Sequence, residues 1–192
     1  GPGLLNALAG LGTAYACSSP VLLICGQVPS TSFGKRLGLL HEVEDQIKVA
    51  ANLTKWSRQV LTVEEIPIAV HEAMYQLKAG RPRPVLLEIP PDILAASGQP
   101  VFLEKQHCSI KSPPIRKEIS EAANILLSAK YPIILSGGGA ITSGSSKEIL
   151  AVAEFLQSPI VTTPEGKGIV PESHYLCMGG ASVGLGPMKD II

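Results

Sequence analysis

The segment PVLLICGQVP, residues 20–29, decides the fold class of this sequence. Val21–Cys25 are consecutive apolar residues, closed off by Pro20 on one side and Gly26 on the other. A short, uninterrupted apolar run between turn residues is typical of a strand buried in a parallel sheet. The loop after such a strand lies at its carboxyl end, which is where open α/β sheets bind ligands.

Helical patterns alternate with strand patterns on both sides of this segment. Residues 4–17 predict a helix whose apolar face consists of Leu4, Leu8, Leu11 and Tyr15. A short helix over 43–51 and a strand over 54–60 are expected next. Thr62–Glu65 resembles a capping box, and it opens a helix that runs to Gly80. The run PVLLEIP, residues 84–90, is fenced by prolines and is expected to be the last strand of its sheet.

A second α/β run follows a stretch without periodicity, residues 95–117, which we interpret as a linker. It comprises a helix over 119–126, a strand over 132–136, a glycine loop at 137–139, a helix to 156 opened by a capping box at 145–148, and a strand over 159–163. We expect no further element before residue 192. The sequence therefore predicts parallel, doubly wound (Rossmann-like) α/β sheets in two partial domains, 1–94 and 118–192, joined by 95–117.

Composition excludes several classes of function. The formal net charge of the 192 residues is zero, so the chain has no basic surface of the kind that binds nucleic acid. No apolar run approaches the roughly 20 residues of a membrane span, and Gly1–Gly3 does not begin a signal peptide. The four cysteines form no C-x-x-C pair, so we expect small buried residues in a reducing compartment. A cytoplasmic or organelle-matrix protein is predicted.

Three segments are candidates for chemistry. Gly1-Pro2-Gly3-x-x-Asn6 heads a helix, where it is either a plain turn or a place where the backbone can approach a cofactor. Gly137-Gly138-Gly139 follows a strand, and it is either a tight turn or a phosphate site at the next helix. His41 lies in a polar loop beyond a strand end, either as a general acid or base or as a solvated residue. The remaining histidines, at 71, 107 and 174, are expected to be structural or exposed.

The order of several motifs then points to one family. The chain resembles the thiamine diphosphate-dependent enzymes of the acetolactate synthase, pyruvate oxidase and 2-keto acid decarboxylase group. The resemblance extends over essentially the whole chain, and its fairly specific feature is the order and spacing of the motifs. These are GPGxxN at 1–6, PVLLICGQVP at 20–29, TKW at 54–56, GRPxPVL at 80–86, IPxD at 89–92 and TTxxGKGxxP at 162–171.

The resemblance implies a three-domain enzyme of which this chain is the back half of the pyrimidine-binding domain, a linker and the front of the central domain. The family's active glutamate would lie before residue 1, and its Gly-Asp-Gly…Asn-Asn motif for Mg²⁺ and the diphosphate does not occur here. By resemblance, the full-length parent binds thiamine diphosphate and Mg²⁺ and acts on a small 2-keto acid or acyl substrate as a homo-oligomer, a dimer or tetramer. The chain alone is expected to be inactive without the rest of its own chain.

The resemblance also gives roles to individual residues. Leu40-His41-Glu42 stands where synthases often have Phe-Gln-Glu beside the reacting carbons, which makes His41 the candidate catalytic residue. Gly137–Gly139 matches the loop that holds FAD in flavin-containing members, but Pro164-Glu165 replaces their usual Leu-Met, and a buried carboxylate would suit a flavin diphosphate poorly. FAD or another adenine nucleotide is therefore left open but not favoured. The residues that match the loop and helix near the aminopyrimidine are Gly1, Pro2, Gly3 and Asn6.

Two other classes of function compete with this interpretation. A nicotinamide-dependent dehydrogenase would need a G-x-G-x-x-G motif with an acidic residue about 20 positions on, and the chain lacks it. A non-catalytic nucleotide-binding or interaction module derived from the same family stays open as the alternative. No residue is predicted to bind a metal.

Overall fold

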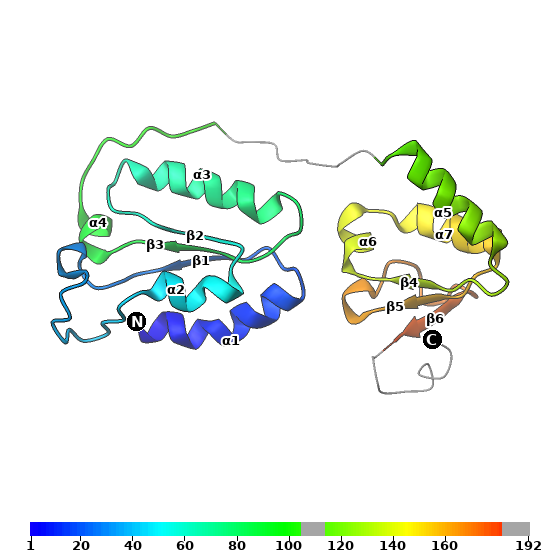
Figure 1. The fold of residues 1–192 in the computed structure, drawn as a ribbon, viewed down its shortest axis with the longest axis horizontal. Coiled ribbons are helices and arrows are strands. Elements are labelled where there is room, and N and C mark those ends of the chain that lie inside the picture. Colours follow the sequence, from blue (N-terminus) through cyan, green and yellow to red (C-terminus); the bar gives the residue numbers. More distant parts are fainter. Residues whose placement is uncertain (105–113, 182–192) are drawn as a thin grey trace. The chain divides into compact units, whose positions relative to one another are not determined.

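The structure is a computed structural model that describes residues 1–104 and 114–181. The chain divides into two units, Gly1–Lys111 and Ser112–Ile192, and each contains a three-stranded parallel sheet with helices packed on it (Figure 1). The predicted fold class, parallel α/β sheets in two parts, is confirmed. The domain boundaries stay a prediction, because much of the expected linker lies outside the described residues, as do His107 and Cys108.

The first unit has its last strand along the chain at the centre of its sheet. The strand order is β1-β3-β2, and Glu88 of β3 is level with Cys25 of β1 and with Gln59 of β2. The elements are α1 (Pro2–Ala16), β1 (Leu22–Cys25), η1 (Ser30–Ser32), α2 (Gln46–Ala50), η2 (Ala51–Leu53), β2 (Trp56–Gln59), α3 (Glu65–Lys78), β3 (Val85–Glu88) and α4 (Pro91–Ala95).

Helices cover both faces of this sheet (Figure 1). Alternate residues of β3 point to opposite sides: Val85 and Leu87 pack with α3, whereas Leu86 packs with Leu4 of α1 and Ala50 of α2. Every residue of β3 is buried, because β3 has a strand on each side and helices above and below.

Strand β1 differs from the prediction that it would be buried. It lies at the edge of the sheet and pairs with β3 alone, and the Ile24 side chain is 55% exposed. An apolar run predicts the strand but not its place in the sheet. The capping box predicted at the start of α3 is present only in part. The Thr62 hydroxyl accepts from the Glu65 amide at 3.3 Å, but the Glu65 carboxylate accepts from the Leu61 amide at 3.0 Å, and the helix begins at Glu65 with Glu64 as an N-cap that forms no side-chain hydrogen bond.

The second unit has the strand order β4-β5-β6. Strand β6 contradicts the expectation that no element follows residue 163; two of its four residues are glycines, Gly179 and Gly180, and glycine is uncommon inside strands. The elements are α5 (Arg116–Ser128), β4 (Ile134–Ser136), α6 (Gly138–Ser143), α7 (Ser146–Leu156), β5 (Ile160–Thr162), η3 (Pro164–Gly166) and β6 (Cys177–Gly180).

Two further details of this unit were predicted wrongly. Gly138 and Gly139 open helix α6 and are not loop residues. Ser145 is the N-cap residue of α7, but its side chain does not cap the helix. Its hydroxyl donates instead to the Ala140 carbonyl of α6 at 3.1 Å, which also accepts from the Ser145 amide at 3.2 Å.

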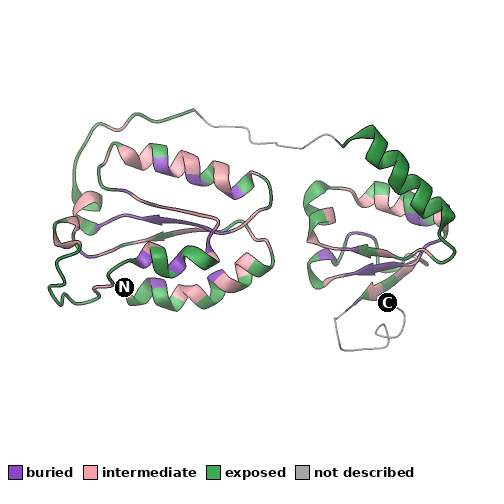
Figure 2. Cartoon of the chain, viewed as in Figure 1, coloured by how far each residue is buried: buried purple, intermediate pink, exposed green. Residues whose placement is uncertain are grey.

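Helix α5 forms as predicted, but its apolar stripe is not packed. Figure 2 shows this helix exposed along its length, and Ile119 and Leu126 are 51% and 39% exposed.

The cysteines also depart from the expectation of burial: Cys17 is exposed, and Cys25 and Cys177 are half-buried. Among the described residues, none of the helices combines the length and the apolar character that crossing a membrane requires.

Candidate functional site

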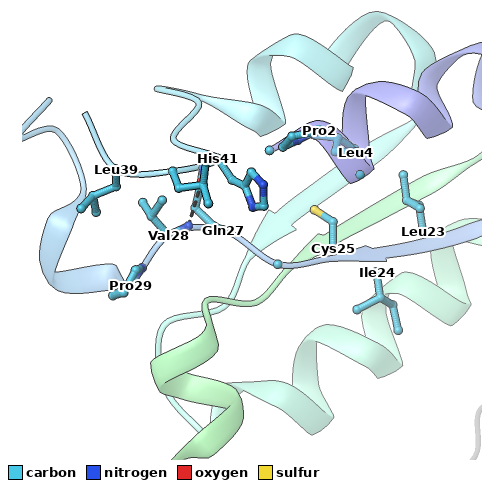
Figure 3. Close-up of a pocket in the computed structure, with 14 residues that line it drawn as sticks. Pro2, Leu4, Leu23, Ile24, Cys25, Gln27, Val28, Pro29, Leu39 and His41 are labelled. Atoms are coloured by element: carbon cyan, nitrogen blue, oxygen red, sulfur yellow. Dashed lines mark hydrogen bonds between the residues drawn. The ribbon is translucent and has the colours of Figure 1, made fainter. Parts of the chain in front are cut away.

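An open cavity of about 780 Å³ lies in the first unit, where the carboxyl end of β1 meets the head of α1 (Figure 3). Its position agrees with the rule that ligands collect at the carboxyl ends of parallel strands. We refer to it as the Gly1 cavity. Its wall consists mainly of backbone and aliphatic side chains, contributed by Gly1, Pro2, Gly3, Leu4, Leu23, Ile24, Cys25, Gly26, Gln27, Val28, Pro29, Leu39, Leu40 and His41.

The structure brings four of the predicted site residues together here: Gly1, Pro2, Gly3 and His41. Gly1 lies so close to the backbone of residue 41 that a Cβ atom on it would come within 2.4 Å of the His41 carbonyl oxygen and 2.7 Å of the His41 Cβ. Only glycine allows this approach. Asn6 does not belong to the cavity; it is exposed, further along α1.

His41 sits in a tight turn that its neighbours close. The Glu42 amide donates to the Leu39 carbonyl at 3.0 Å, and the Leu39 amide donates to the Glu42 carboxylate at 2.9 Å. The φ angle of His41 is 70°, in the left-handed region that residues other than glycine seldom adopt. Such conformations gather at functional sites. Figure 3 shows the imidazole directed into the cavity, on the side where Pro2 and Cys25 lie.

Cys25 is the reactive side chain that the cavity wall adds to those predicted. Burial, together with the Glu88 carboxylate, raises the pKa of its thiol to about 11. The thiol therefore stays protonated at neutral pH, and since the thiolate is the nucleophile, Cys25 is not suited to nucleophilic catalysis.

Beside the cavity lies a buried carboxylate that the sequence analysis treated only as part of a strand. Glu88 is 1% exposed and accepts hydrogen bonds from the side-chain amides of three glutamines. The distances to its carboxylate oxygens are 2.6 Å from Gln59, 2.9 Å from Gln46 and 3.5 Å from Gln27. The signal was present in the sequence: Glu88 is an acidic residue inside the otherwise apolar run of residues 84–90.

The glycines Gly137, Gly138 and Gly139 belong to the second unit and form a separate candidate site. A Cβ on Gly138 would lie 3.0 Å from the Glu165 Cβ, so this acidic residue lies against the glycines. Glu165 is exposed, which corrects the expectation of a buried carboxylate, and its carboxylate accepts from the Thr163 hydroxyl at 3.2 Å. A carboxylate beside the glycines disfavours a diphosphate, but water screens an exposed one, so FAD stays open and not favoured at these residues.

The Gly1 cavity fits one part of thiamine diphosphate better than the rest. Its aliphatic and backbone wall suits a flat aminopyrimidine ring, and Gly1 allows the His41 loop to close against this wall. Mg²⁺ prefers several oxygen ligands. Within the described part of the chain, no cluster of three or more His, Cys, Asp or Glu side chains could hold a metal ion. The described residues of the cavity wall therefore fit the ring of the cofactor.

Two parallel α/β units, with a cavity at the carboxyl end of the first sheet, are typical of the α/β proteins that bind a ligand at this edge of a sheet. Two family models match the sequence. The N-terminal TPP-binding domain of thiamine pyrophosphate enzymes matches residues 1–50, and the central domain of thiamine pyrophosphate enzymes matches residues 119–189. The chain belongs to the family of thiamine pyrophosphate-dependent enzymes.

Curated relatives agree with this assignment. A probable acetolactate synthase large subunit of Methanocaldococcus jannaschii is 36% identical over 185 residues, which are 93% of this chain and 31% of that protein. A probable 2-ketoarginine decarboxylase of Pseudomonas aeruginosa is 35% identical over 196 residues, 100% of this chain and 34% of that protein. An acetolactate synthase large subunit of Buchnera aphidicola is 38% identical over 179 residues, which are 91% of this chain and 31% of that protein. The chain thus spans about a third of the length of these relatives.

Proposed function

We propose that the complete protein is a thiamine diphosphate- and Mg²⁺-dependent enzyme that acts on 2-keto acids or related acyl substrates. Its reaction is decarboxylation or carbon–carbon bond synthesis, as in acetolactate synthases. One observation supports this most strongly: every residue that lines the Gly1 cavity lies between Gly1 and His41, inside the segment that matches the TPP-binding family model.

In this proposal the chain's own residues hold the ring and serve the substrate. Gly1–Gly3 and Gly26–Pro29 form the wall against which the aminopyrimidine packs. Thiamine diphosphate, when bound, supplies the electron sink for decarboxylation. His41 donates a hydrogen bond to the substrate carboxylate or transfers a proton as a general acid or base.

The proposed function is tested first on the unmodified gene product. Purified protein supplied with thiamine diphosphate and Mg²⁺ should release CO₂ from at least one 2-keto acid in a panel that includes pyruvate and 2-ketoarginine. The release should stop when either the cofactor or the metal is withheld. A protein that releases no CO₂ from any member of the panel would exclude this function.

The role of His41 is tested by His41→Gln in the same protein. Glutamine can still donate to a carboxylate but cannot titrate, so kcat should fall by about 10²- to 10⁴-fold and its dependence on pH between 5 and 8 should flatten. His71→Gln is the matched control, because His71 lies on α3, outside the cavity wall. Wild-type kcat for His41→Gln across this pH range would show that His41 is only a loop residue.

We also propose that the protein is a homo-oligomer in the cytoplasm or an organelle matrix. The apolar stripe of α5 and the exposed Ile24 at the edge of the first sheet support self-association, because such surfaces are usually covered in an assembly. None of the three described cysteines forms a disulfide, which suits a reducing compartment.

A further inference from the structure

Glu88 carries a charge that the structure balances in an unusual way. A buried carboxylate costs free energy unless hydrogen bonds or a cation compensate it. None of the ion pairs among the described residues includes Glu88; its partners are the amides of Gln27, Gln46 and Gln59. These three come from three different segments: the loop after β1, helix α2 and strand β2. One carboxylate therefore joins three segments that are distant in sequence.

Gln46 connects this carboxylate to the head of α1. Its Nε2 donates to Glu88 Oε2 at 2.9 Å and to the Gly26 carbonyl at 2.8 Å, and its Oε1 accepts from the Gly1 nitrogen. The Gln46 side chain is 1% exposed, and both its amide nitrogen and its amide oxygen form hydrogen bonds. The amide cannot turn over without losing the contacts to Gly1 and Gly26 together, so its orientation is fixed.

Gln27 connects the same carboxylate to the loop that carries His41. Its Nε2 donates to the Val43 carbonyl at 3.0 Å and to Glu88 Oε2 at 3.5 Å. Its own Oε1 accepts from the Val28 amide at 3.0 Å. The two walls of the Gly1 cavity, the turn at Gly1 and the loop at His41, are thus each linked to Glu88 through one glutamine.

We propose that Glu88 is a positioning residue that sets the distance between Gly1 and the His41 loop, and so the orientation of the imidazole in the cavity. The close approach of Gly1 to His41 makes this spacing critical, because a small displacement of either side opens or closes the contact. This inference rests on the proposed function for its kinetic consequence, but the positioning itself is a property of the fold. Displacements of about 1 Å near reacting groups cost on the order of 10²-fold in rate.

Two substitutions of Glu88 separate its acceptor role from its charge. In Glu88→Gln the new amide oxygen can still accept from Gln46, because Gln59 can turn its own amide to meet the new NH₂ group. Glu88→Met has a similar length but no strong acceptor, and it leaves Gln46 and Gln27 without this partner. Both variants remove the carboxylate charge, so any difference in behaviour between them is due to the hydrogen bonds that residue 88 accepts.

The first measurement is hydrogen exchange of the complete gene product, which requires no activity. In Glu88→Met, peptides over residues 1–8 and 39–47 should exchange at least several-fold faster than in the wild type, whereas α3 should not change. Glu88→Gln should stay close to the wild type. Glu72→Gln is the matched control, because Glu72 pairs with Gln76 on α3 and does not belong to the cavity wall. Unchanged exchange at the cavity, or equally faster exchange throughout the protein, would overturn the proposal.

The second measurement is a double-mutant cycle with His41→Gln, using kcat for whichever 2-keto acid is turned over. Glu88→Met alone should lower kcat by about 10- to 100-fold, with rescue in Glu88→Gln. If Glu88 acts through His41, the double variant should be much less impaired than the product of the two single losses. Multiplicative losses would overturn the proposal. A protein with no activity refutes the proposed function but leaves the exchange measurement to decide on Glu88.

Discussion

Gly1 and His41 show how one missing side chain can create a site. The backbone of residue 41 occupies the space that a Cβ on Gly1 would need, and the turn over Leu39–Glu42 holds it there in a left-handed conformation. The sequence singled out both residues, because a glycine turn at a helix head and a histidine beyond a strand are visible as patterns. It could not show that they touch, since 40 positions separate them and no local pattern encodes such a contact.

The contact predicts the effect of Gly1→Ala in the complete protein. The new Cβ cannot be accommodated by rotating a side chain, because the atom it meets at 2.4 Å is a backbone oxygen. The His41 loop must shift, and kcat should fall about 10²-fold. Gly10→Ala is the control: a Cβ there meets nothing within 4 Å, and alanine should stabilise α1 by up to about 1 kcal/mol. Equal kcat values for the two variants would contradict the close contact between Gly1 and the His41 backbone.

Cys25 gives a prediction that depends on chemistry at a single atom. Burial, followed by the Glu88 carboxylate, raises the pKa of this thiol to about 11, so at pH 8 only about 10⁻³ of it is thiolate. Iodoacetamide should therefore label Cys25 much more slowly than the exposed Cys17, as followed by peptide mass spectrometry. In denaturant the two rates should converge. Equal rates in the native protein would show that Cys25 is not shielded.

At the level of elements, the sequence predicted what forms but not always where it lies. The apolar run at 84–90 gave β3, yet only the structure shows that β3 is central and β1 an edge strand, because strand order depends on long-range pairing. Strand β6 was missed because half of its residues are glycines, which are uncommon inside strands. The glutamines that surround Glu88 were missed for a related reason: each lies in a different segment, and only the folded sheet brings them together.

The link between η1 and α4 predicts how the first unit responds to acid. The Asp92 carboxylate accepts from the Ser30 hydroxyl at 2.5 Å and from the Ser30 amide at 2.9 Å, and these two hydrogen bonds lower the Asp92 pKa in the folded state. Because the Asp92 pKa is lower in the folded than in the unfolded state, ionised Asp92 stabilises the fold at pH values above the unfolded-state pKa, near 3.8. This stabilisation is lost as pH falls through the folded-state pKa of Asp92.

Asp92→Asn should therefore destabilise the protein at pH 7 and have a smaller effect at pH 3. Asparagine keeps one oxygen acceptor but loses the charge that strengthens both hydrogen bonds. The measurement is the midpoint of urea unfolding for the variant and the wild type at the two pH values. A difference between the proteins that is as large at pH 3 as at pH 7 would show that the Ser30 contacts do not depend on ionised Asp92.

Across the whole molecule, the two units differ in how completely their helices are packed. In the first unit, α1, α2 and α3 cover both faces of a central strand. In the second unit, no residue of α5 is buried, although its spacing of apolar residues is that of a packed helix. An amphipathic stripe is normally covered, so we expect another part of an assembly to bind against α5. The sequence correctly predicted the apolar face of α5. It could not show which surface packs against that face, because the spacing of apolar residues carries no information about the partner.

The last prediction concerns this stripe in the 192-residue chain. We expect the chain to self-associate through α5, because exposed apolar area of this kind gains free energy when two copies exclude water from it. Sedimentation at increasing concentration should show dimers or larger species, and Ile119→Glu combined with Leu126→Glu should shift them toward monomer. Val101→Glu is the control: this residue is 75% exposed but lies outside every helix. A wild-type chain that stays monomeric over the concentration range would contradict the prediction, whereas equal dissociation by Val101→Glu would move the contact away from α5.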